Sequence, residues 1–341
     1  MRAPGEAPGR QKDKAGGDRR AAQDSALRAG LSANYPFRVA VCVSMLLSRG
    51  TESVVGRGLF SGVDASVRFT PTAALTVRRA DADAACELRP SVARTARDGS
   101  WAGLPAGVPV RNTTIEVARG VYAGTVEHAL SAAAGLGAWA CAVELRGVEA
   151  PIGDGSAKAF VDVLRPVLTR GRAAEPVTIG SPVEVRHERT GAVIRATPCP
   201  PARAPVYMYR LVGGVLEGQS ASWRVGDAES YITQIAPART FSFEAEARAA
   251  RAAGLFPHLT TRDMLVLRTD GSPIDNMLRF PDEPARHKLL DLIGDLALLG
   301  GPLWADVEAV GSGHAMAHDL CRAARKQGED RGVVPPSEAR T

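Results

Sequence analysis

An internal repeat constrains the fold of this 341-residue chain more than any other feature of its sequence. Each copy is predicted to run helix, strand, Gly-Ser turn, helix. The four segments are residues 125–137, 138–147, 152–156 and 157–168 in the first copy, and 285–301, 303–310, 311–314 and 315–326 in the second. Strand-like segments precede both copies. The sequence therefore predicts an α+β protein of two similar halves, and sites favour the interface between such halves.

The boundary between the halves is expected near Arg170–Pro176. The second half carries an extra segment, with a helix predicted at 243–255 and a strand at 263–270. The ends of the chain are polar and contain few large apolar residues, so we expect them to be disordered. The predicted organisation is a disordered basic arm (1–48), an N-terminal α+β domain (49–172), a C-terminal α+β domain with the extra segment (173–328) and a flexible tail (329–341).

The net charge of +5 does not indicate a nucleic-acid-binding protein. Residues 1–49 hold nine Lys/Arg and four Asp/Glu, which accounts for the whole excess, and the remaining chain has 33 of each sign. The basic character thus belongs to the arm and not to a folded surface. We expect no nucleic-acid partner and a monomer.

The cysteines and the hydropathy pattern indicate the cellular compartment of the protein. Five scattered cysteines with no CxxC pair suit a reducing compartment. No apolar run approaches the roughly 20 residues of a membrane span; the stretch at 39–47 is predicted as a strand. We expect a soluble cytoplasmic protein. The alternative is an organelle interior, mitochondrion or plastid, if the arm is a transit peptide, although its four acidic residues are unusual for one.

One face of the second-half helix carries a histidine and two carboxylates. His287, Asp291 and Asp295 are spaced i, i+4, i+8, and such positions drift by only about 40° per step around a helix. The adjacent face is rich in leucine and is predicted to enter the core, where a buried charge needs a partner. His287 and Asp291 lie one helical turn apart, which is the spacing of paired zinc ligands on a helix.

The repeat supplies a third candidate ligand. His128 falls opposite His287 when the two copies are aligned. Three protein ligands would leave an open position on a catalytic zinc, and the neighbouring Glu127 could act as a general base. Thr125 is predicted as the N-cap that places both residues in the first helical turn.

Other interpretations of these residues stay open. A His–Asp pair at i, i+4 is often only a surface interaction on a helix. His314 could pair with Asp295, or it could serve as a turn residue that caps the last helix. His318 lies four residues after His314, but it has no partner in the sequence, and we do not predict a second metal site from it.

Five segments of the chain together resemble the motifs of the UDP-3-O-acyl-N-acetylglucosamine deacetylase family. They are GTVEHALSAAAGLG, APIGDGSAKAFVDVL, QIAPARTFSF, LRFPDEPARHKLLDLIGDLALLGG and GSGHAMAHDL, in this order between residues 50 and 326. The resemblance implies a zinc amidase of lipid A biosynthesis. Its expected fold has two similar domains, each a two-layer sandwich of a sheet and helices, with the active site between them.

The resemblance also implies a role for each matched residue. His128, His287 and Asp291 would bind Zn²⁺, and Glu127 would be the general base. His314 would be the general acid or electrostatic partner, oriented by Asp295, and Thr240 would donate to the developing oxyanion. Lys288 would meet the diphosphate of an acylated UDP-amino-sugar. Phe241 and Phe243 would lie near the mouth of an acyl tunnel formed by the extra segment.

Three departures from the family pattern concern residues expected near the substrate. GLFSG replaces GLHSG, so Phe60 stands where a histidine is usual. GLFPHLTT replaces GLxxGGS, and GSGH replaces KSGH or KAGH, so Gly311 stands where a lysine is usual. Two alternatives to the family reaction therefore remain: a deacetylase for a different N-acyl sugar, and a zinc-holding relative that binds a sugar nucleotide or acyl ligand with weak turnover.

Overall fold

The computed structural model describes residues 45–88, 102, 111–171 and 174–329. Within these residues, no helix combines the length and the apolar character that a membrane span needs. The strand predicted at 39–47 is described only from residue 45, where β1 (Met45–Leu47) pairs antiparallel with β9 (Leu168–Arg170). The N-terminal half thus includes residues before position 49. The rest of the predicted arm, the predicted tail beyond residue 329 and the boundary at 172–173 lie outside the described residues.

The sheet of the first half has five strands in the order β2-β3-β8-β4-β5. These are β2 (Val54–Arg57), β3 (Asp64–Pro71), β8 (Cys141–Arg146), β4 (Thr76–Arg79) and β5 (Ala84–Glu87). The central strand β8 is antiparallel to β3 and parallel to β4. Alternate residues of β3 (Ala65, Val67 and Phe69) are buried, because successive side chains of a strand point to opposite faces.

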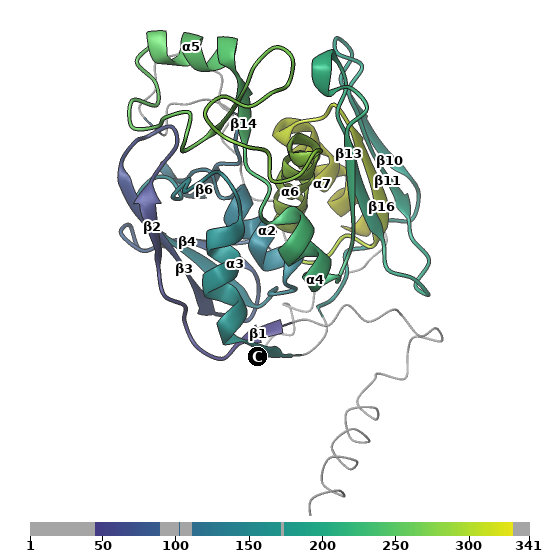
Figure 1. Ribbon diagram of the computed structural model, residues 1–341. Helices are drawn as coiled ribbons and strands as arrows, with labels where there is room; N and C mark the ends of the chain where they lie inside the picture. Colours follow the sequence, from purple (N-terminus) through teal and green to yellow (C-terminus); the bar gives the residue numbers. More distant parts are fainter. Residues whose placement is uncertain (1–44, 89–101, 103–110, 172–173, 330–341) are drawn as a thin grey trace, which may run out of the picture. The chain divides into compact units, whose positions relative to one another are not determined.

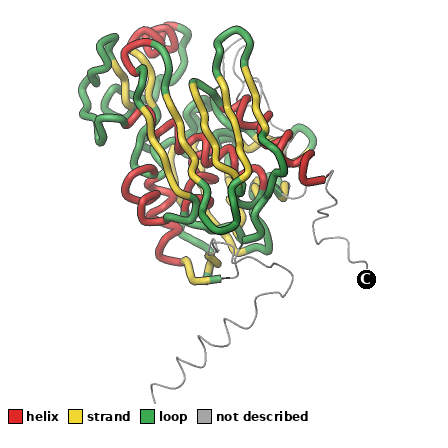
Figure 2. Tube along the Cα trace, turned by 90° about the vertical axis from the view of Figure 1, so that its right-hand side faces the viewer, coloured by secondary structure: helices red, strands yellow, loops and turns green. Residues whose placement is uncertain are grey.

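The sheet of the second half repeats this topology. Its order is β10-β11-β16-β12-β13, and Figure 2 shows these strands side by side with helices behind them. The strands are β10 (Val183–Arg186), β11 (Val193–Pro198), β16 (Ala305–Val310), β12 (Val206–Arg210) and β13 (Ser220–Arg224). The central β16 is again antiparallel to one neighbour and parallel to the other. Two sheets with the same strand order and the same pairing directions confirm the predicted repeat.

Helices from the two halves pack between the sheets (Figure 1). In the first half, α2 (Glu127–Gly135) and α3 (Lys158–Leu164) cover the sheet, and a 3₁₀ turn η2 (Arg165–Val167) follows. In the second half, α6 (Glu283–Leu296) continues into η5 (Ala297–Leu299), and α7 (His314–Glu329) packs beside it. Every residue of α2 is buried, because α2 lies against α6 as well as its own sheet.

Each half also contains short strands or helices outside its main sheet. The first half has a hairpin of β6 (Ile115–Ala118) and β7 (Val121–Ala123). The second has η3 (Gly214–Leu216), α4 (Ala228–Ser230) and the π-turn η4 (Tyr231–Ile235). Its extra segment contains β14 (Phe241–Phe243), α5 (Glu244–Ala252) and β15 (Leu265–Leu267), with β14 parallel to β15. The helix and the strand predicted there are confirmed.

Thr125 is not the N-cap of α2, contrary to the prediction. The helix begins at Glu127 after Val126, and Thr125 has a positive φ of 52°. Its hydroxyl donates instead to Oε1 of the fully buried Glu149, at 2.7 Å. A carboxylate with no access to water needs hydrogen-bond donors, and this requirement outweighs the local preference of threonine for a cap.

The contact between α2 and α6 predicts a large effect of one methyl group. A β-carbon on Gly294 would lie 2.1 Å from the carbonyl oxygen of Glu127, so Gly294→Ala must push the two helices apart. We expect the free energy of unfolding to fall by about 1–3 kcal/mol, the usual cost of overpacking. Urea denaturation of both proteins measures the change.

Gly328→Ala is the matched control, because Gly328 also lies in a helix and its added β-carbon would meet nothing within 4 Å. We expect this variant to be as stable as the wild type or slightly more stable, since alanine favours helices over glycine. Equal stability of Gly294→Ala and Gly328→Ala would contradict the close helix contact.

Candidate metal centre and its surroundings

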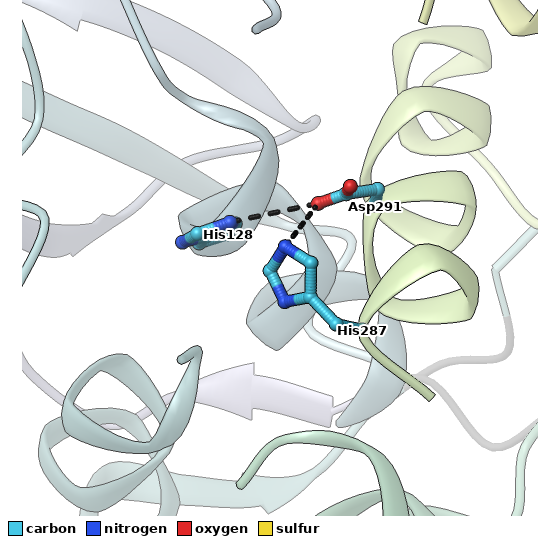
Figure 3. Close-up of side chains that lie close together, drawn as sticks. All are labelled: His128, His287 and Asp291. Atoms are coloured by element: carbon cyan, nitrogen blue, oxygen red, sulfur yellow. Dashed lines mark ion pairs between the residues drawn. The ribbon is translucent and has the colours of Figure 1, made fainter. Parts of the chain in front are cut away.

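Three buried side chains from the two halves converge at the contact between α2 and α6. His128 comes from the first turn of α2, and His287 and Asp291 come from adjacent turns of α6 (Figure 3). One nitrogen or oxygen atom of each lies within 4.8 Å of the other two. The two imidazole rings are 5.2 Å apart between centroids and nearly perpendicular. The predicted trio is therefore assembled as a group that could hold a metal ion.

The distances within this trio suit a tetrahedral metal. Oδ1 of Asp291 lies 3.5 Å from Nε2 of His128 and 3.3 Å from Nε2 of His287. Two donor atoms at 2.0–2.1 Å from a tetrahedral zinc would be about 3.3 Å apart. Two imidazoles and one carboxylate are also a donor set that zinc accepts, so the residues present fit the ion that the sequence predicted.

A backbone carbonyl fixes the orientation of one of these imidazoles. Nδ1 of His287 lies 3.2 Å from the carbonyl oxygen of Ala238. Because a carbonyl can only accept, Nδ1 carries the proton, and the lone pair of Nε2 is directed to the trio. Burial lowers the pKa of His287 to about 3, which keeps the ring neutral, as metal ligation requires.

The third ligand candidate is held as an anion. Burial by itself would raise the pKa of Asp291, but the neighbouring His287 and Lys288 outweigh it and hold the pKa well below its usual range. The ammonium Nζ of Lys288 is 3.0 Å from Oδ2 of Asp291. Lys288 also lines a small cleft together with Tyr209 and His314. The structure thus places this predicted residue beside the trio, in contact with one member of it.

Glu127 is buried in the same region, one residue before His128. Its Oε2 accepts a hydrogen bond from the backbone N–H of Thr113 at 2.9 Å. Burial raises the pKa of Glu127 to about 7, and Asp291 and Asp295 add to this, while His314 and His128 oppose it. A carboxyl group whose pKa lies near neutrality can both accept and return a proton, which is the property of a general base.

His314 and Asp295 form the pair that the sequence suggested. Nδ1 of His314 lies 2.9 Å from Oδ2 of Asp295, and Nε2 lies 3.9 Å from Oδ2 of Asp291. Burial would lower the pKa of His314, but Asp295 raises it to about 9. Conversely, burial would raise the pKa of Asp295, and His314 and His318 lower it to about 2. His314 is the first residue of α7 and not part of the preceding turn.

Two residues of this region were missed by the sequence analysis. The sequence indicates no partner for His318, but its Nε2 lies 3.3 Å from Oδ1 of Asp295. The hydroxyl of Thr113 lies 2.5 Å from the same oxygen. His318 follows His314 by one helical turn, so the i, i+4 spacing was a signal for it. No sequence pattern indicated Thr113, because its partner is 182 residues away.

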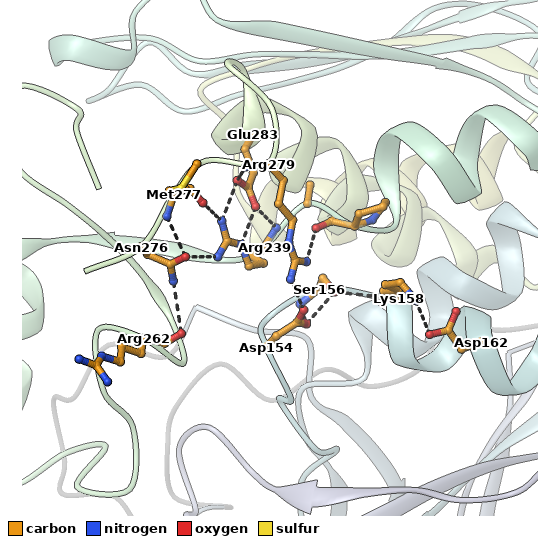
Figure 4. Close-up of polar contacts among 12 residues, drawn as sticks. Asp154, Ser156, Lys158, Asp162, Arg239, Arg262, Asn276, Met277, Arg279 and Glu283 are labelled. Atoms are coloured by element: carbon orange, nitrogen blue, oxygen red, sulfur yellow. Dashed lines mark hydrogen bonds and ion pairs between the residues drawn. The ribbon is translucent and has the colours of Figure 1, made fainter. Parts of the chain in front are cut away.

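The segment that carries Thr240 is fixed by contacts from both halves. The backbone N–H of Thr240 donates to the carbonyl of Gly155 at 2.7 Å, and the N–H of Ala157 donates to the carbonyl of Ala236 at 3.0 Å. The guanidinium of Arg239 is paired with the fully buried Glu283 at 2.8 Å (Figure 4). Thr240 is thereby held between the turn of the first half and the start of α6.

A second ion pair in Figure 4 ties the same region together. Arg279 binds Asp154 at 2.7 Å and the carbonyl of Pro237 at 2.7 Å. Asp154 also accepts from the hydroxyl of Ser156 at 2.7 Å. These contacts give the Gly-Ser turn of the first half (152–156) a structural role.

Phe241 and Phe243 lie beside a separate apolar cluster. Their rings meet edge to face with centroids 6.4 Å apart, and both pack against buried Leu216, Leu265 and Leu267. This cluster joins the extra segment to η3 and is distinct from the main core. The extra segment therefore presents half-buried aromatic side chains over an apolar base.

The departures at Phe60 and Gly311 have structural explanations. The ring of Phe60 meets that of Phe256, in the extra segment, edge to face at 5.6 Å. Gly311 has a φ of +60°, and a β-carbon there would lie 2.4 Å from Cγ2 of Val212. A lysine at position 311 would clash with Val212, so glycine and valine fit as a pair. Phe60 thus forms an aromatic contact where the family pattern has a histidine. Val212 fills the space beside Gly311, where the family pattern has a lysine.

Comparisons with known proteins agree with this arrangement. The family model for UDP-3-O-acyl N-acetylglycosamine deacetylase (LpxC) matches residues 49–326. The UDP-3-O-acyl-N-acetylglucosamine deacetylase of Chlamydia muridarum is 31% identical over 79% of this chain and 93% of its own. The deacetylases of the same name from Anaeromyxobacter sp. and Synechocystis sp. are 34% and 33% identical, over 79% of this chain and 84% and 94% of their own. The chain therefore belongs to the family of UDP-3-O-acyl N-acetylglycosamine deacetylases.

Proposed function

We propose that this chain hydrolyses the N-acetyl group of UDP-3-O-acyl-N-acetylglucosamine in lipid A biosynthesis, and that it uses zinc to do so. The products are acetate and the free 2-amino sugar nucleotide. One observation carries the proposal: a trio suited to zinc is accompanied by a buried carboxyl group, Glu127, and by an imidazole, His314, that a second carboxylate holds. Base, metal ligands and acid are the groups that amide hydrolysis needs.

Zinc held by His128, His287 and Asp291 would supply a Lewis-acid centre for the acetamide carbonyl and for water. Glu127 accepts the proton of the attacking water at its carboxylate. His314 gives a proton from Nε2 to the sugar nitrogen as the carbon–nitrogen bond breaks, so the amine leaves neutral. Asp295 stabilises the charged imidazole during this step and keeps Nδ1 protonated.

The remaining predicted residues are assigned to substrate binding. Thr240 donates to the oxyanion that develops on the carbonyl oxygen. Lys288 lines the small cleft beside His314 and meets the diphosphate, for which its ammonium is suited. Phe241 and Phe243, over their apolar cluster, border the path of the acyl chain.

The packing of Phe60 and Gly311 favours a second candidate, a deacetylase for a different N-acyl sugar. Val212 occupies the space that a side chain at position 311 would need, and Phe60 adds apolar surface next to the extra segment. Both changes affect the substrate's surroundings and leave the trio, Glu127 and His314 in place.

Product analysis tests the proposal and its alternative. Purified full-length chain is incubated with a panel of UDP-3-O-acyl-N-acetylglucosamines of different acyl length and with other N-acyl UDP-sugars, and mass spectrometry follows the free amine. We expect release of acetate from at least one UDP-3-O-acyl-N-acetylglucosamine, abolished by a strong chelator and restored by zinc. Turnover of another N-acyl sugar alone would support the second candidate, and turnover of none would support a weakly active zinc-holding relative.

Two substitutions distinguish the role of a metal ligand from the role of the general base. Asp291→Ala removes a metal ligand, so zinc content and activity should fall together. Glu127→Gln keeps all three ligands, so zinc content should stay at about one per chain while turnover falls by roughly 10²–10⁴-fold, the usual contribution of one positioned proton-transfer group. Metal analysis and acetate release are measured on the same preparations. Wild-type turnover by Glu127→Gln would exclude Glu127 as the base.

A further inference from the structure

We propose that Thr113 and His318 are positioning residues that join Glu127 and His314 into one hydrogen-bonded unit. This inference rests on the function proposed above, in which Glu127 is the base and His314 the acid. Thr113 is completely buried just before β6, and His318 is buried on α7. Neither residue is a candidate metal ligand, and neither belongs to the steps described so far.

Thr113 contacts the base, Glu127, and the carboxylate that holds the acid, Asp295, through different atoms. Its backbone N–H donates to Oε2 of Glu127 at 2.9 Å. Its side-chain Oγ1 lies 2.5 Å from Oδ1 of Asp295 and 2.9 Å from Nε2 of His318. One residue of the first half therefore reaches α2 through its backbone and both α6 and α7 through its hydroxyl.

The numbers of donors and acceptors fix where the protons lie. An ionised carboxylate only accepts, and a threonine hydroxyl has a single proton to give. The Thr113 hydroxyl therefore donates to Oδ1 of Asp295 and accepts from Nε2–H of His318. The other carboxylate oxygen, Oδ2, accepts from Nδ1–H of His314 at 2.9 Å. The Thr113 hydroxyl and Nδ1–H of His314 thus donate to different oxygens of Asp295, and His318 donates to the Thr113 hydroxyl.

This arrangement holds Asp295 from two sides. Because its two oxygens have different partners, the carboxylate cannot rotate without breaking a bond, and His314 keeps Nε2 directed to the metal trio. Glu127 is held by the backbone of the same Thr113, so the base and the acid keep a constant separation. Buried networks of this kind are strengthened when every member is satisfied.

Substitutions of Thr113 isolate the hydroxyl, because the backbone bond to Glu127 remains in each of them. Thr113→Val replaces the hydroxyl by a methyl group, and Thr113→Ala removes it without crowding Asp295. We expect both to lower kcat by about 10–100-fold, the usual effect of losing a partner of an active-site group. KM and zinc content should stay unchanged. Thr113→Ser keeps the hydroxyl and should recover most of kcat.

Thr114→Val is the matched control. Thr114 is also completely buried, and its hydroxyl binds Asn112 at 3.2 Å and not Asp295. The same chemical change one residue away should leave kcat at the wild-type value. Equal kcat values for Thr113→Val and Thr114→Val would overturn the proposal, and so would a Thr113→Ser variant as slow as Thr113→Val.

A second measurement needs no substrate. Nitrogen-15 NMR of the imidazoles in the full-length zinc-loaded protein, assigned with His318→Gln, shows which ring nitrogen of His318 carries a proton. We expect a proton on Nε2, and we expect the His318 and His314 signals to shift in Thr113→Val but not in Thr114→Val. A proton on Nδ1 alone would overturn the inference. If the wild type releases no acetate, the proposed function fails, and the NMR result still decides this inference.

Discussion

The close contact between α2 and α6 is the interaction on which the rest of the site depends. Gly294 lies against the backbone of Glu127 with no room for a β-carbon. This approach lets His128 of one half reach His287 and Asp291 of the other, at distances that a small metal ion can span. The repeated sheets, with equal strand order, present the two helices to each other. Duplication thus explains why the two histidines, which align in the repeat, come from matching positions.

The buried charges at this contact stabilise one another in an apolar setting. Asp291, Asp295 and Glu127 are buried beside the leucine-rich core, and the side chain of His314 is 10% exposed. Removing a charge from water is costly unless partners replace the lost hydration. Here the partners are ring nitrogens, a lysine, a threonine and a backbone N–H. The same partners set the protonation of the base, the acid and the ligands, so the fold and the chemistry use one set of contacts.

The parts of the site that depend on short spacing or on the repeat could be predicted from the sequence. His287 and Asp291 are one helical turn apart, and the repeat led to His128. The helices, most strands and the extra segment followed from periodicity and turns. The roles of Thr113 and Thr125 could not be predicted, because their partners are distant in the sequence. Thr113 contacts Asp295 and Thr125 contacts Glu149 only after folding. Strands β4 and β5 were missed, since their four-residue segments have weak alternation.

X-ray absorption at the zinc edge of the purified full-length chain tests the central claim most directly, that ligands from both halves hold one zinc. The predicted spectrum has only nitrogen and oxygen neighbours at about 2.0–2.1 Å, with the outer scattering of two imidazoles, and the outer scattering falls to one imidazole in His128→Ala. A sulfur neighbour at about 2.3 Å, or a spectrum that His128→Ala leaves unchanged, would contradict the account.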